Sequence, residues 1–160
     1  MKLSLEILEP KHPCSQGLEW YKKNPTDTVE ACVEKLLAET DAVCPDRLNW
    51  ANWLLTRMFT KEQCVKYAIF ADEQVIGIYE KKYPEDKRPR KAIDAAKEYL
   101  KDPSEKNKAA AGDAARAAGD AWDAWDAWDA AGDAAWAAAW AAMKIKIIQY
   151  GVTLTKEEAA

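Results

Sequence analysis

The residues most capable of covalent chemistry are few in this chain. Its 160 residues include one histidine, His12, and four cysteines. Serine and cysteine hydrolases need a base beside the nucleophile, and His12 lies between Lys11 and Pro13, where an exposed or packing role is expected. The sequence contains no GxxxxGK[ST] or GxGxxG phosphate-binding motif and no HExxH zinc motif. We therefore expect no catalytic residues, and the sequence does not favour an enzyme.

The cysteines do not form a metal-binding pattern. None of them belongs to a CxxC pair, and a zinc site needs closer ligand pairs. Scattered thiols are typical of reduced core residues in a cytoplasmic protein, so we expect neither a metal nor another cofactor. The four residues are Cys14, Cys32, Cys44 and Cys64.

The segment AWDAWDAWDAAGDAAWAAAW, residues 121–140, combines tryptophan and aspartate at regular intervals. On a helix its five indoles share an arc of about 120°, the width of a core-facing stripe. Packing against alanine explains most of the pattern. However, Asp126, Asp129 and Asp133 fall on or beside this arc, where a carboxylate needs a partner. A helix break, an internal cation or a basic partner protein would each account for them.

The Trp/Asp segment therefore supplies the candidate partner-binding residues. These are Trp122, Asp123, Trp125, Asp126, Trp128, Asp129 and Asp133.

A basic segment, KKYPEDKRPRK at residues 81–91, supplies the candidate anion-binding residues Lys87, Arg88, Arg90 and Lys91. Arg90 and Lys91 are expected at a helix N-terminus, where positive charge is unfavourable without an anion nearby. The arginines could bridge to the aspartates of the Trp/Asp segment. Alternatively, the cluster could bind a nucleotide phosphate, or it could be an ordinary solvated charge run.

The apolar spacing predicts an all-α fold in a single domain, residues 1–160. An array of short helices is expected over 13–101, followed by an alanine-, tryptophan- and aspartate-rich helical tract over 104–150. The expected helices are 13–23, 29–40, 48–58, one beginning after Thr60, 90–101, and the tract, which Ser104 and Glu105 open and Gly151 ends. Only residues 2–8 and 144–149 alternate enough to be strands.

Two details of this prediction concern how helices begin and break. Asp27 and Glu30 have the spacing of a capping box for the second helix. Within the tract, Gly132 followed by Asp133 favours a break that folds it into a hairpin; one continuous helix is the alternative.

The overall charge limits which kinds of molecule the protein is expected to bind. A net charge of −4 and a pI near 5.2 argue against nucleic acid and favour a basic partner. The N-terminus does not resemble a secretory signal, and no apolar run is long enough to span a membrane, so a cytoplasmic location is expected.

Several segments give the chain a resemblance to a known family. They are GLEWY (17–21), NWANWLL (49–55), YEKKYPEDKRPRKAI (79–93) and the AAW-type repeats (134–142). Together they resemble the immunity proteins associated with bacterial polymorphic toxin systems, over about residues 14–142. The resemblance implies a protein that a bacterium or a phage uses against a toxin or a defence effector.

Three functions follow as hypotheses. The leading one is a non-enzymatic inhibitor that binds and neutralises a toxin or defence effector by protein–protein contact, using its acidic surface against a basic target. The alternative is a sponge-like protein that sequesters a small anionic ligand such as a signalling nucleotide. The third is a helical scaffold or oligomerisation module.

Overall fold

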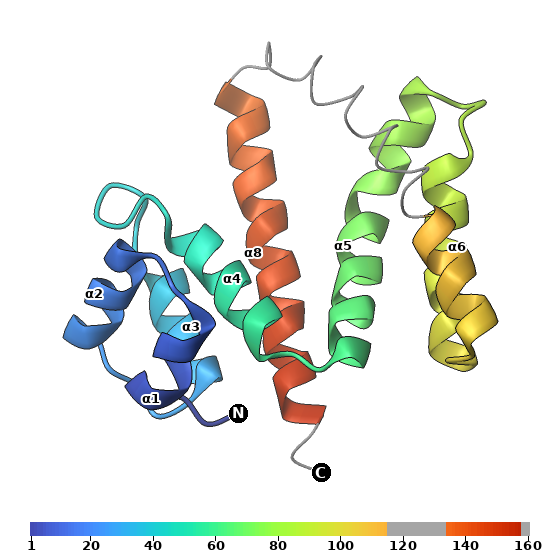
Figure 1. Ribbon diagram of the computed structural model, residues 1–160. Coiled ribbons are helices and arrows are strands. Elements are labelled where there is room, and N and C mark those ends of the chain that lie inside the picture. The colour runs from blue at the N-terminus through green and yellow to red at the C-terminus, as the bar shows by residue number, and fades with distance from the viewer. Residues whose placement is uncertain (115–133, 158–160) are drawn as a thin grey trace. The chain divides into compact units, whose positions relative to one another are not determined.

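The computed structural model describes residues 1–114 and 134–157, and within them every regular element is helical (Figure 1). The predicted all-α class is therefore confirmed. Residues 105–114 are also helical and follow Ser104, whose carbonyl accepts from Lys108 N over 2.9 Å. The named elements are α1 (Leu5–Leu8), η1 (Glu9–Lys11), α2 (Ser15–Lys23), α3 (Val29–Ala38), α4 (Arg47–Met58), α5 (Lys61–Lys82), α6 (Arg88–Lys101) and α8 (Ala134–Glu157).

The chain divides into two compact units. One consists of residues 1–60 with 144–160, and the other of residues 61–143. The unit boundaries do not coincide with the change in composition near residue 104, and a single domain over 1–160 stays a prediction. None of the described helices is long and apolar enough to cross a membrane.

The first unit is built on the packing of α3 against α4. Val29, Val33 and Leu36 recur at helical spacing on α3 and are buried, as the sequence pattern predicts. Leu54 and Leu55 of α4 are buried in the same unit. The hydrophobic effect of this buried stripe holds the two helices together.

Buried Arg47 fixes the connection between α3 and α4. Its Nε donates to Asp41 Oδ1 over 2.7 Å, and its Nη1 donates to the Leu37 carbonyl over 3.2 Å. These two bonds satisfy two of the five N–H donors of the guanidinium, and the Asp41 carboxylate supplies an opposite charge, which offsets the cost of burial. The contact sets where α4 begins relative to the end of α3.

The second unit contains the hairpin of α5 and α6, which run antiparallel side by side (Figure 1). Ile69 and Ile76 of α5 and Ile93 of α6 form its buried centre. Pro89 lies in the first turn of α6, where the missing N–H costs no hydrogen bond, so this helix begins two residues earlier than predicted, at Arg88.

Neither of the two segments that alternate like strands forms a strand. Residues 5–8 form α1, and Lys2 makes only an isolated bridge with Thr28. Residues 144–149 belong to α8, because Ile148, Val152 and Thr155 form one buried helical face. Because residues on both sides of Gly151 are buried on this face, α8 continues past Gly151 to Glu157. The prediction that Gly151 ends the helix is therefore wrong.

The cap of α3 also differs by one residue from the prediction. Thr28, and not Asp27, is the N-cap: its Oγ1 accepts from Ala31 N over 3.2 Å. The choice between one helix and a hairpin in the alanine-rich tract lies outside the described residues.

Candidate functional site

The basic segment lies at the turn from α5 to α6, and Asp86 organises it. The carboxylate of Asp86 accepts from the Tyr79 hydroxyl over 2.8 Å and from Arg88 Nη2 over 2.6 Å. It also accepts from the backbone N–H of Arg88 over 3.0 Å, at the first residue of α6. These donors, the Arg88 side chain first among them, hold the pKa of Asp86 well below its usual range.

Arg90 pairs with Glu80 across the same hairpin. Its Nε and Nη2 donate to the two carboxylate oxygens of Glu80 over 2.9 and 2.7 Å. This fork-on-fork geometry lowers the pKa of Glu80 and raises that of Arg90. Farther along, Lys97 pairs with Glu73 over 2.6 Å.

Arg88 and Arg90, two of the predicted anion-binding residues, therefore form ion pairs with carboxylates of the same hairpin. Lys87 and Lys91 are exposed. The aspartates of the Trp/Asp segment lie outside the described residues, so a bridge from the arginines to them stays a prediction. For the same reason, the structure gives no placement for Trp122, Asp123, Trp125, Asp126, Trp128, Asp129 or Asp133.

One indole of the predicted stripe is described. Trp140 of α8 packs with Ile78, Tyr79 and Tyr83 in the second unit. The packing interpretation of the stripe therefore holds for this residue.

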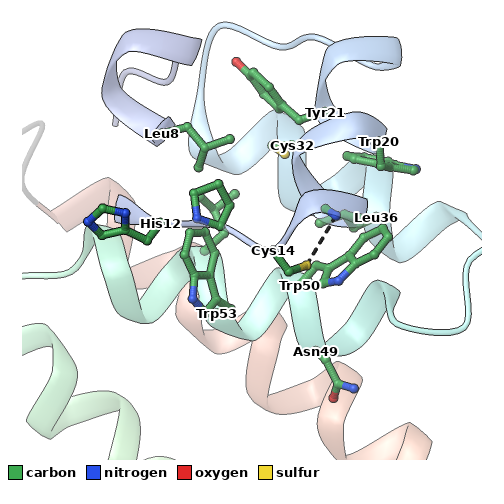
Figure 2. Close-up of a pocket in the computed structure, with 13 residues that line it drawn as sticks. Leu8, His12, Cys14, Trp20, Tyr21, Cys32, Leu36, Asn49, Trp50 and Trp53 are labelled. Atoms are coloured by element: carbon green, nitrogen blue, oxygen red, sulfur yellow. Dashed lines mark hydrogen bonds between the residues drawn. The ribbon is translucent and has the colours of Figure 1, made fainter. Parts of the chain in front are cut away.

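The first unit contains a cavity of about 410 Å³ (Figure 2). It is lined by residues of α2, α3 and α4, by Leu8 of α1 and by the segment that joins η1 to α2. The side chains on its wall are mainly apolar and aromatic. The lining residues are Leu8, His12, Pro13, Cys14, Gly17, Trp20, Tyr21, Cys32, Leu36, Asn49, Trp50, Trp53 and Leu54.

Three tryptophans define the aromatic part of the wall. Trp20 and Trp50 are tilted by 52° with ring centroids 6.4 Å apart. The Trp53 ring has Arg57 above it, with the guanidinium carbon 6.0 Å from the centroid. Gly17 lies beside Cys14 and Trp50: a Cβ placed there would lie 3.2 Å from Cys14 Sγ and 3.6 Å from the indole nitrogen and Cε2 of Trp50.

The cysteines of the wall differ from each other. Cys14 is exposed and is the N-cap of α2, with its Sγ accepting from Gly17 N over 3.3 Å. Cys32 is buried, and burial raises the pKa of its thiol to about 11. The predicted core position is confirmed for Cys32 and Cys44, whereas Cys64 is half-buried. It is wrong for Cys14, because capping a helix places this residue at the surface.

His12 has the expected exposure and one feature that the sequence does not show. Its backbone is left-handed, with φ of 56°, at the end of η1. Among the described residues, no group of three or more His, Cys, Asp or Glu side chains is arranged to hold a metal ion.

Sequence analysis did not predict the cavity. The helix expected over 48–58 contains Trp50, Trp53 and Leu54, but the sequence does not indicate which residues face them. The available signal was the pair of tryptophan-containing motifs, GLEWY and NWANWLL, which lie on α2 and α4 and meet at this cavity.

The comparison with known families gives one match. Residues 54–159 match the family model described as "Imm-5 like putative immunity protein". The match confirms the family that the resemblance indicated, although it begins after GLEWY and extends beyond the alanine repeats. No curated protein and no solved structure matches the chain.

Proposed function

The chain belongs to the Imm-5-like immunity proteins, and we propose that it neutralises a protein toxin or defence effector by binding it, without catalysis. The observation that carries the proposal is the family match itself, which spans the α5–α6 hairpin and the alanine-rich tract. An inhibitor of this kind needs a recognition surface and a stable scaffold, and no reacting group.

We place the recognition surface on the Trp/Asp segment. Its carboxylates would steer a basic target toward the complex and orient it, while any exposed indoles would anchor the contact. The net charge of −4 has the sign that such steering requires. A sponge for nucleotides has less support, because Arg88 and Arg90 are already paired with Asp86 and Glu80.

The experiment begins with affinity capture from the native host and mass spectrometry to identify the target. Association is then followed by stopped flow at several salt concentrations for wild type and for Asp123→Lys/Asp126→Lys. Because steering raises association rates by tenfold or more at low salt, the double variant should associate about tenfold more slowly and protect less well.

The matched control is Glu34→Lys/Asp94→Lys, which makes the same change in net charge at two exposed positions. It should associate nearly as fast as wild type. Equal rates for both double variants would contradict an acidic recognition surface on the Trp/Asp segment. Heat released with a nucleotide panel, with no stoichiometric protein complex, would instead support sequestration.

A further inference from the structure

The cavity of the first unit has the dimensions of a ligand site. Its volume of about 410 Å³ lies within the range of small-molecule pockets, roughly 300–1,000 Å³. All of its lining residues lie between Leu8 and Leu54, almost entirely before the region that matches the family. Membership of the family therefore does not account for it.

The chemistry of the wall selects against a charged ligand. No lysine, arginine, aspartate or glutamate belongs to the described lining residues. A carboxylate or a phosphate entering this space would lose water without gaining a counter-charge from the lining residues, which is costly. The guanidinium of Arg57 lies over Trp53, 6.0 Å from the ring centroid, and does not belong to the lining. An uncharged aromatic group would instead exchange water for contact with the rings of Trp20, Trp50 and Trp53.

The indoles also leave hydrogen-bond donors available. None of the three tryptophans donates a hydrogen bond to another residue in the described part of the chain. The indole nitrogen of Trp50 borders Gly17, which contributes no side chain to fill the space. A ligand with a carbonyl, ether or hydroxyl oxygen could accept a hydrogen bond from one of these indole N–H groups.

We propose that this cavity binds an uncharged, flat aromatic molecule that carries a hydrogen-bond acceptor. The site is separate from toxin recognition as proposed above, so either function can fail without the other. Cys14, an exposed thiol on the wall, reports on whether the cavity is occupied.

Two probes of one shape test the ligand class on the full chain by titration calorimetry. Naphthalene-2-carboxamide is neutral and carries a carbonyl oxygen, whereas naphthalene-2-carboxylate has the same ring system with a negative charge. The amide should bind saturably with a stoichiometry of one. The carboxylate should bind at least about tenfold more weakly, because its charge is desolvated without compensation.

A blocking variant locates the binding. Gly17→Leu places a side chain against Trp50 and should abolish binding of the amide. Gly77→Leu is the matched control, since Gly77 also lies in a helix but a Cβ there meets nothing within 4 Å. This control should bind the amide like wild type. Circular dichroism compares the folding of both variants.

A second readout needs no variant. Adding the amide should lower the rate at which Cys14 of wild type reacts with a thiol reagent, in proportion to the fraction of cavities occupied. No saturable binding, equal affinity for the two probes, or unchanged binding in a folded Gly17→Leu protein would each overturn the proposal. It is also overturned if Gly17→Leu lowers protection against the toxin while wild type binds no amide, because the cavity would then hold a partner's side chain.

Discussion

Arg90 of α6 and Glu80 of α5 form a two-bonded ion pair, with nitrogen–oxygen distances of 2.9 and 2.7 Å. Beside it, Asp86 joins the Tyr79 hydroxyl to the start of α6. These contacts fall within YEKKYPEDKRPRKAI, the most distinctive segment of the sequence. Its charged residues therefore fasten a helical hairpin, and this role explains why acidic and basic side chains are interleaved there.

The Glu80–Arg90 pair predicts how stability depends on pH. Arg90 lowers the pKa of Glu80, so the pair stabilises the fold above the ordinary glutamate pKa of about 4.3 and loses this contribution as pH falls below it. Glu80→Gln should therefore be less stable than wild type at pH 7, and the difference should vanish toward pH 3. Urea unfolding at a series of pH values measures it.

The control for this prediction is Glu98→Gln. Glu98 pairs with Lys101 over 2.6 Å on one helix, where both side chains are exposed. Such surface pairs contribute little, so this variant should unfold almost like wild type at every pH. A gap between wild type and Glu80→Gln that did not narrow as the pH fell would mean that the carboxylate charge is not its cause.

Tyr79→Phe tests the other contact of the hairpin. The variant keeps the buried ring and removes the hydroxyl that donates to Asp86. Since a hydrogen bond to a charged group contributes about 1.5–3 kcal/mol, the free energy of unfolding should fall by about this amount. Tyr99→Phe should change it little, because the Tyr99 hydroxyl has no hydrogen-bond partner among the described residues. Equal effects of the two variants would contradict the role of Asp86.

Cys14 should be the most reactive thiol of the folded protein. It is exposed, whereas Cys32 is buried with a pKa of about 11, and burial also raises the pKa of Cys44 and Cys64. A rise of about two pKa units lowers the thiolate fraction of Cys32 roughly a hundredfold at neutral pH. A thiol reagent should show one fast phase that Cys14→Ser removes. A fast phase that survives in this variant would contradict the assignment.

The sequence allowed prediction of those features that depend on local spacing. The buried stripe of α3 and the end of α2 at Lys23 both follow from residues a few positions apart. The all-α class was also predictable, because it depends on apolar spacing along the whole chain. The family was predictable because several complete motifs indicated it.

The features that sequence analysis missed depend on contacts between distant residues. Residues 144–149 alternate like a strand, yet burial of Ile148 and Val152 in the first unit makes them helical. The cavity arises only when Trp20 of α2 and Trp50 of α4 are brought together. Likewise, the spacing of the basic segment did not indicate that Arg88 pairs with Asp86 and Arg90 with Glu80.

His12 offers a test of backbone strain beside the cavity. Its φ of 56° and ψ of 57° are left-handed, a conformation that costs a residue with a Cβ about 1–2 kcal/mol. Glycine removes this cost but loses about 0.5–1 kcal/mol through its more flexible unfolded chain. His12→Gly should therefore unfold with a free energy about 0.5–1 kcal/mol higher than His12→Ala, since both variants lack the imidazole and only alanine keeps the strain. Denaturant unfolding of the two variants measures the difference. A His12→Ala variant that is more stable than His12→Gly would contradict backbone strain at the end of η1.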